Sequence, residues 1–306
     1  MKIKDFRTIW DSLANSIIGF YLFVMIIFMI LIDYQKVMSH ARVATLSRLM
    51  PDFEYLHRLG AGQEELNKDK LQPYLFYYEK VSQYVPRADA FGILGYIYFH
   101  LGKEKKAVTC FRKASALYPD AFNFHYNLGV IYFRRQYYKE AAAELEKAAA
   151  ASFDKNLNYI TSSRIYFPFF SHHADLPLRL RRYLKTGFRN ACRLLISSYM
   201  NLKDYKRMLY YSSKGIAAAL DEDKDFYYFA GLAAFNLGKF EQAGAFFKAY
   251  LTVNPDDGNA VYYLGLTLQS LGDPVTAEKV LKKAEALHYN EGGKNSGTDM
   301  IFLNIF

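Results

Sequence analysis

Few side chains in this sequence have the types and spacing that catalysis or metal binding requires. His172, His173 and Asp175 offer two imidazoles and a carboxylate, but adjacent histidines rarely converge on one ion and no fourth ligand follows them. The only cysteines, Cys110 and Cys192, lie too far apart for a CxxC metal or redox motif. We therefore expect no metal site and no cofactor.

The sequence also lacks the motifs of common active sites. It contains no phosphate-binding loop, no HExxH and no GxSxG, and residues 60–62 (GAG) lack the third glycine of a dinucleotide-binding turn. Apolar residues make up 52% and charged residues 23%, which excludes global disorder. The net charge of +9 favours an anionic partner. We predict a folded, non-enzymatic protein with no catalytic residues.

Positive charge is concentrated between residues 154 and 189, a segment that contains seven basic, two acidic and seven aromatic residues. Such a surface suits anionic lipid headgroups and equally an acidic protein surface, or it packs on the rest of the fold with its charges in solvent. Single-stranded nucleic acid is disfavoured because no RNP-like or helix-turn-helix pattern is present. The candidate residues are Arg164, Arg179, Arg181, Arg182, Lys185 and Arg189. Since Pro168 and Pro177 interrupt a long helix, we expect a loop in the first half and a helix over 178–184.

An uncharged run covers residues 12–32, which at ~1.5 Å per residue would span roughly 31 Å, the thickness of a hydrocarbon core. Trp10 and Tyr34 flank it, where interfacial aromatics are favoured. A cleaved signal peptide is the alternative, but the apolar core exceeds the ~7–15 residues of a signal sequence. We expect a single transmembrane helix, with a bacterial inner membrane as its location. Basic residues are nearly balanced on both sides, and their clustering before the run favours a periplasmic array.

A repeat of 34 residues is the strongest pattern in the chain. With Ala88 counted as position 1, glycine recurs at position 8 and alanine at position 20 in units that begin at residues 88, 122, 224 and 258. Glycine in the middle of a helix costs roughly 1 kcal/mol relative to alanine, so we expect a neighbouring backbone to approach closely there. Glycines at position 15 mark turns between paired helices. The position-8 and position-15 glycines are Gly95, Gly129, Gly231, Gly265, Gly102, Gly238 and Gly272.

These positions resemble the signature of the tetratricopeptide repeat (TPR) family. The resemblance implies an all-α, TPR-type α-solenoid of helix-turn-helix repeats, here preceded by a single transmembrane helix. Weaker matches begin near residues 54 and 189. The expected domains are an N-terminal tail (1–11), a transmembrane helix (12–32), a juxtamembrane linker or helix (33–53), a degenerate repeat (54–87), repeats (88–121 and 122–153), the basic aromatic insertion (154–188), a degenerate repeat (189–223), repeats (224–257 and 258–290), and a linker with an apolar tail (291–306).

The TPR resemblance implies that positions 2, 5, 9, 12 and 13 of each first helix line an inner groove. Tyrosines at position 5 exclude the lysine and asparagine clamp by which some TPR arrays grip a terminal carboxylate. The groove is aromatic and aliphatic, which suits an apolar peptide or helix, unless the array curls and these side chains bury one another. The candidate groove residues are Tyr96, Phe99, Asn123, Tyr126, Val130, Phe133, Arg134, Tyr228, Leu232, Phe235 and Tyr262.

The C-terminal residues form an apolar tail behind a linker (EGGKNSGT). Because apolar side chains should not float in water, we expect the tail to cap the last repeat or to dock on a neighbouring subunit. Its candidate residues are Met300, Ile301, Phe302, Leu303, Ile305 and Phe306.

Together, these features favour a membrane-anchored protein–protein interaction scaffold or an accessory subunit of a membrane complex. The alternative is a chaperone or assembly factor that transiently holds apolar segments of membrane or exported client proteins. Both hypotheses place an apolar segment of another protein in the groove, and they differ in whether one stable partner or many transient clients occupy it.

Overall fold

A computed structural model describes residues 20–22, 24–32, 54–60, 63–163, 175–218 and 224–287. Residues 20–22 and 24–32 are helical. The further helices, in chain order, are α2 (Glu54–Gly60), α3 (Lys68–Tyr84), α4 (Ala88–His100), α5 (Glu104–Leu117), α6 (Phe122–Arg134), α7 (Tyr138–Ala149), α8 (Phe153–Ser162), α10 (Leu176–Asn201), α11 (Tyr205–Ala217), α12 (Asp225–Asn236), α13 (Phe240–Leu251), α14 (Gly258–Ser270) and α15 (Pro274–Ala286).

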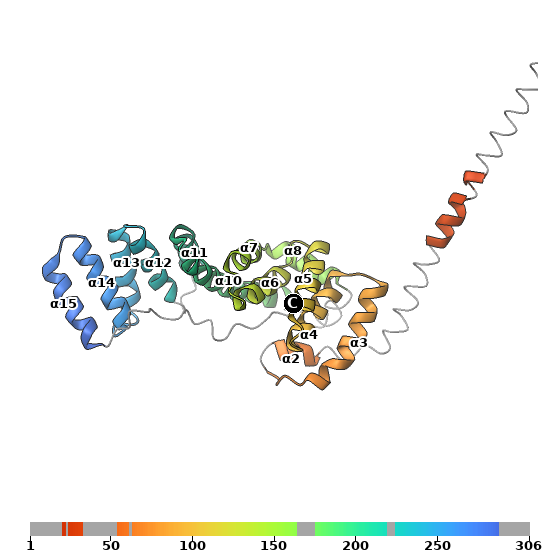
Figure 1. Cartoon of the computed structure of the whole chain (residues 1–306), viewed down its shortest axis with the longest axis horizontal. Helices are drawn as coiled ribbons and strands as arrows, with labels where there is room; N and C mark the ends of the chain where they lie inside the picture. Colours follow the sequence, from red (N-terminus) through yellow and green to blue (C-terminus); the bar gives the residue numbers. More distant parts are fainter. Residues whose placement is uncertain are drawn as a thin grey trace, which may run out of the picture.

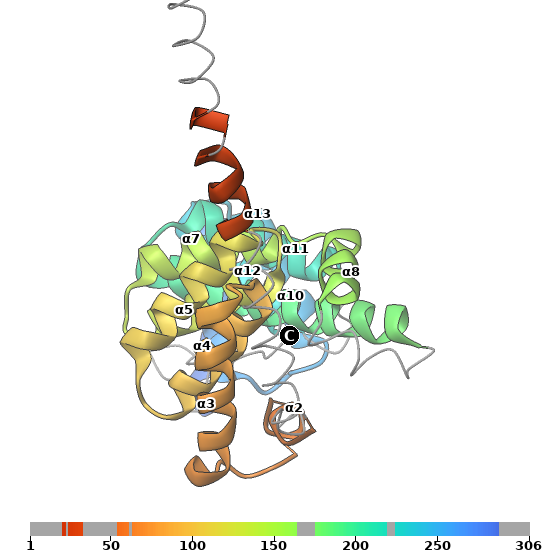
Figure 2. The same ribbon diagram turned by 90° about the vertical axis from the view of Figure 1, so that its right-hand side faces the viewer.

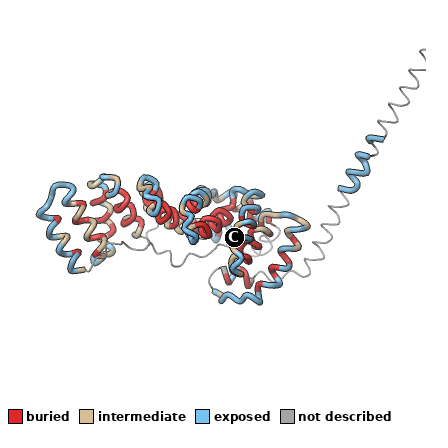
Figure 3. The backbone as a smooth tube through the Cα atoms, in the orientation of Figure 1, coloured by how far each residue is buried: buried red, intermediate tan, exposed pale blue. Residues whose placement is uncertain are grey.

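Neighbouring helices pack as pairs, α4 with α5, α6 with α7, α10 with α11, α12 with α13 and α14 with α15. Figure 1 shows these pairs following one another along the stack. Buried residues line the helix sides that face adjacent helices, while exposed residues lie on the outside (Figure 3). Each pair thus leaves an apolar face that its neighbour covers. The predicted all-α, TPR-like helical repeat fold is confirmed.

The position-8 glycines create room for a bulky side chain of the paired helix. A Cβ atom on Gly95 would lie 2.8 Å from ring atoms of Phe111, and one on Gly231 would lie 2.7 Å from the ring of Phe247. Such distances leave no space for a methyl group. The expectation of a close contact holds, but the neighbour is a buried side chain on the second helix rather than a backbone.

The turns within the five helix pairs share one backbone conformation at position 15. Gly102, Gly238 and Gly272 have φ angles of 75°, 70° and 82°, in the left-handed region that glycine adopts without strain. Gln136 and Lys203 occupy the same position in the other two pairs, with φ angles of 61° and 56°. The shared turn therefore persists where the sequence does not supply glycine.

Tyrosines at position 11 connect successive repeats in the first part of the stack. The hydroxyl of Tyr98 donates to Glu79 of α3, that of Tyr132 accepts from Arg112 of α5 at 2.7 Å, and that of Tyr199 donates to Glu146 of α7 at 2.6 Å. Ala234 and Leu268 hold this position in α12 and α14. The hydrogen-bonded links made by this position therefore end before α12.

The inserted segment contains more helix than expected. Instead of a loop after residue 154, α8 begins at Phe153, where the Ser152 hydroxyl accepts a hydrogen bond from the Lys155 amide and caps the helix. Pro177 lies in the first turn of α10, where its missing N–H is not needed, so it starts this helix rather than interrupting it. The 26-residue α10 then runs through the expected boundary between residues 188 and 189.

In the part of the chain that the structure describes, no helix has the length and apolar character to cross a membrane. Residues 12–19, in the first half of the predicted span, lie outside the described residues, as do 33–53. The helical residues 20–22 and 24–32 expose their side chains, which are all apolar apart from the hydroxyl of Tyr21.

A partly buried carboxylate, Glu144, links α7 to α6, and we expect it to make the stack sensitive to acid. The Nε2 atom of His125 lies 2.8 Å from the Pro119 carbonyl, which only accepts, so Nε2 carries a proton, and Nδ1 lies 2.6 Å from Glu144. Burial alone would raise the pKa of Glu144, but hydrogen bonds from His125 and Lys147 together lower it below its usual value.

We expect Glu144→Gln to lower the free energy of unfolding at neutral pH by about 1.5–3 kcal/mol. The pKa of Glu144 is lower in the folded state than in the unfolded state. The contribution of its carboxylate to the free energy of unfolding is therefore fully present above the ordinary glutamate pKa and is lost as the pH falls through the folded-state pKa. Urea denaturation at pH 6 and at pH 3.5 should thus show a smaller acid-induced loss in the variant. Glu140→Gln, at an exposed site on the same helix, is the control, and equal losses in both variants would contradict the assignment.

Candidate partner-binding surface

The structure buries six of the eleven predicted groove residues, so they cannot all line an open groove. Phe99, Phe133, Phe235 and Tyr262 are half-buried, and Arg134 is exposed. The buried residues are Tyr96, Asn123, Tyr126, Val130, Tyr228 and Leu232. Their burial agrees with the alternative in which the inner side chains cover one another.

The insertion buries the inner side chains at the start of α6. Tyr126 stacks on Phe122 with ring centroids 5.2 Å apart, and the ring of Tyr183 in α10 meets Phe122 edge-on at 5.8 Å. Burial raises the pKa of Tyr126 well above its usual value, so the phenol stays neutral. The repeat positions of the TPR family could not predict the contact between Tyr183 and Phe122, because Tyr183 belongs to the segment that breaks the repeat.

A second buried aromatic cluster lies between α12 and α13. Tyr228 packs against Phe247 with ring centroids 6.1 Å apart and against Tyr250 at 5.4 Å. Tyr228, at position 5, therefore turns into its own helix pair and strengthens the core.

Four half-buried apolar side chains remain accessible at position 12 of successive first helices. We call Phe99 of α4, Phe133 of α6, Met200 of α10 and Phe235 of α12 the apolar row. The same position in α14 is an exposed glutamine, Gln269, which ends the row. The sequence analysis did not name Met200 because its repeat is degenerate. Counting from residue 189, where that repeat begins, places Met200 at position 12.

Aromatic side chains at the start of the second helices support the apolar row from behind. Phe133 meets Tyr138 edge-on with ring centroids 5.6 Å apart, and Phe235 meets Phe240 edge-on at the same distance. These contacts fix each ring at the turn between paired helices while leaving part of its surface in solvent. Phe133 and Phe235 are thus held in place by aromatic contacts within their own helix pairs.

Two nitrogen-containing side chains flank the first member of the apolar row. The guanidinium of Arg134 lies 5.2 Å from the centre of the Phe99 ring. Burial, together with the nearby charge of Arg134, lowers the pKa of His100 to about 4, so this imidazole is neutral at ordinary pH. The row therefore begins beside one fixed positive charge.

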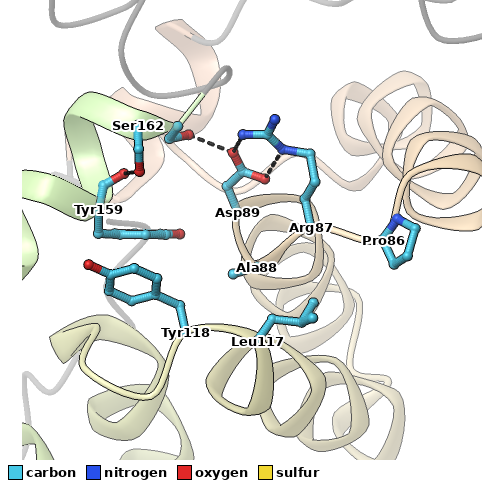
Figure 4. Close-up of a pocket in the computed structure, with 9 residues that line it drawn as sticks. Pro86, Arg87, Ala88, Asp89, Leu117, Tyr118, Tyr159 and Ser162 are labelled. Carbon is cyan, nitrogen blue, oxygen red and sulfur yellow. Dashed lines mark hydrogen bonds and ion pairs between the residues drawn. The ribbon is translucent and has the colours of Figure 1, made fainter. Parts of the chain in front are cut away.

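A separate cavity of about 260 Å³ lies where α4 begins and α5 and α8 end (Figure 4). Beside it, Asp89 is 2% exposed and receives two hydrogen bonds from Arg87, at 3.0 and 2.8 Å, and one from the Ser163 hydroxyl at 2.6 Å. The Ala90 amide donates a fourth at 2.8 Å. Because the carboxylate oxygens are occupied, this cluster joins α8 to α4 rather than offering a reactive acid. No sequence motif pointed to it.

The predicted basic residues have different roles in the structure. Arg179 pairs with Asp175 at 2.9 Å, and the guanidinium of Arg181 lies 4.4 Å from the centre of the Phe153 ring. Arg182 and Lys185 are exposed, and Arg189 is half-buried. Arg164 and the whole tail from Met300 to Phe306 lie outside the described residues, as do His172 and His173. The described residues contain no cluster of three or more metal-ligating side chains.

Comparison with protein families identifies the repeats directly. Residues 95–136 match the profile described as TPR repeat, and residues 122–155 and 230–288 match profiles described as tetratricopeptide repeat. The chain therefore contains tetratricopeptide repeats on both sides of the insertion. Comparison with curated proteins finds no match.

Several solved structures are similar to this chain at low sequence identity. YrrB, described as a TPR protein with an unusual peptide-binding site, is 18% identical, with 74% of this chain and 90% of YrrB covered and a TM-score of 0.47. A MamA protein is 18% identical, with 65% and 91% covered and a TM-score of 0.48. PilF of Pseudomonas aeruginosa is 14% identical, with 79% and 93% covered and a TM-score of 0.44.

Proposed function

We propose that this protein is a non-enzymatic interaction scaffold that binds an apolar peptide or helix along the apolar row and is attached to a membrane by residues 12–32. The binding role is supported by the apolar row itself, because four apolar side chains occupy the same repeat position on α4, α6, α10 and α12. A partner with apolar side chains at regular spacing would bury the accessible part of each side chain.

Crosslinking from inside the apolar row tests this role. A photoreactive phenylalanine analogue at Phe133 of the full chain should crosslink to an apolar segment of another protein, which mass spectrometry then maps. The same analogue at Val275, an exposed site on α15, is the control. One stoichiometric partner would indicate a complex subunit, and many substoichiometric clients would indicate the chaperone role. Equal crosslinking at both sites, or none at Phe133, would overturn the proposal.

Phe133→Arg should weaken the captured interaction by at least about tenfold, because a charge would replace an apolar contact in the centre of the row. Tyr137→Arg is the matched control, since Tyr137 is an exposed aromatic in the same turn but outside the row. Binding is measured with the mapped partner segment, and thermal melting of both variants reports the stability of the fold. Equal loss of affinity in the two variants would argue against the row as the binding surface.

The attachment to a membrane is supported by the uncharged run over 12–32 and by the exposed apolar side chains of helical residues 20–22 and 24–32. In this proposal the chain is a single-pass protein of a bacterial inner membrane with its array in the periplasm. Resistance of the full chain to carbonate extraction tests the attachment. Protease accessibility of the array in spheroplasts tests its side, and protection of the array there would place it in the cytoplasm.

A further inference from the structure

The first half of α10 carries a different kind of side chain on each of two opposite sides. Leu178, Arg182 and Lys185 follow at spacings of four and three residues, so they lie on one side of the helix. All three are exposed, and we call them the outward ridge. Leu180 and Gly187 are buried, and a Cβ atom on Gly187 would lie 2.5 Å from the ring of Phe122. Packing against the stack therefore fixes which residues face solvent.

Two cations beside the outward ridge, Arg179 and Arg181, contact other side chains of the chain. The two cations on the ridge form no ion pair with the described residues. Arg179 pairs with Asp175, and Arg181 lies over the ring of Phe153. Arg182 and Lys185 form no ion pair with any of the described residues. Leu178 is 57% exposed beside them. The ridge thus presents two cations and one apolar side chain along one edge of α10. Figure 2 shows the ribbon of α10 beside that of α8, against which it packs.

We propose that the outward ridge docks on an anionic phospholipid surface. Phosphate groups would pair with Arg182 and Lys185 while Leu178 enters the boundary between headgroups and acyl chains, as the apolar side chains of interfacial helices do. An acidic protein surface would pair with the cations but would gain little from Leu178. The inference rests on the proposed attachment of residues 12–32, which keeps the array near a bilayer.

Tryptophan fluorescence of the full chain can detect this contact. Trp10 is the only tryptophan, so Trp10→Phe combined with Leu178→Trp places a single reporter on the ridge. Vesicles of phosphatidylcholine with brominated acyl chains quench tryptophans that reach the lipid, and they are compared with and without added phosphatidylglycerol. Val275→Trp in the same background is the matched control, because Val275 is exposed on α15. Flotation of the same samples reports attachment of the chain independently.

The expected result is that Leu178→Trp chains are quenched in the anionic vesicles alone, while Val275→Trp chains stay unquenched in both. Arg182→Gln with Lys185→Gln should weaken the docking equilibrium by roughly 30-fold, since each cation near an anionic leaflet contributes roughly fivefold. Chains that float with both vesicle types but show no charge-dependent quenching at position 178 would overturn the ridge proposal and leave the attachment standing. Chains that do not float with anionic vesicles would overturn both.

Discussion

Replacing Phe111 by alanine is expected to lower the free energy of unfolding by about 3–5 kcal/mol. The Phe111 side chain is fully buried between α5 and α4, where its ring fills the space that Gly95 leaves open. Removing the ring leaves a cavity that the paired helices can close only in part. Since repeat arrays can unfold in sections, urea denaturation should be combined with hydrogen exchange of α4 and α5.

A double-mutant cycle tests the stated reason for this loss. Gly95→Ala alone should also destabilise, because its methyl group would meet the Phe111 ring. In the Phe111→Ala background the same methyl group enters the cavity, so the two effects should not add. Leu117→Ala, an exposed site at the end of the same helix, should change the stability by less than about 0.5 kcal/mol. Additive losses at positions 95 and 111 would contradict the proposed packing.

Replacing Arg87 by methionine is expected to cost about 2–4 kcal/mol of unfolding free energy, because it leaves the Asp89 carboxylate buried without its charged partner. The figure lies below the usual range for breaking a fully buried pair because the Arg87 side chain is 26% exposed. Thermal melting and urea denaturation measure the loss, and hydrogen exchange should localise it to α4 and α8, which the Ser163 hydroxyl joins.

An exposed ion pair supplies the control for this experiment. Arg179→Met removes an exposed partner of Asp175 and should change the stability by less than about 1 kcal/mol. Ser163→Ala removes a neutral donor from Asp89 and should give an intermediate loss of about 1–2 kcal/mol. If Arg87→Met and Arg179→Met destabilised equally, burial would not be what makes the Asp89 pair important.

The repeat period predicted the features that depend on neighbours within one repeat. The glycines at position 8 indicated a close contact with the paired helix, and the glycines at position 15 indicated a turn, both set by residues a short distance along the chain. The TPR resemblance implied that Phe99, Phe133 and Phe235 lie on the inner side, and the structure leaves these three side chains half-buried. Spacing along the chain was sufficient for the glycine positions, whereas the groove positions came from the family resemblance.

Features that depend on contacts outside the repeat could not be predicted in this way. Tyr126 stacks on Phe122, which is covered because α10 extends beyond its own repeat and brings Tyr183 to α6. The Asp89 cluster needs Ser163, which is 74 residues away in the chain. One available signal was Gly187, a small residue within a helical stretch, which the structure explains by the nearby ring of Phe122.

The continuity of α10 connects the two proposed binding surfaces. This helix of 26 residues, about 39 Å long, is the first helix of the third helix pair and also carries the outward ridge. The buried Gly187 and Ala191 lie on either side of the expected boundary, so α10 packs against the stack on both sides of it. Because α10 packs against α7 and α11 and carries Met200 near its C-terminal end, a single helix joins the outward ridge to the apolar row.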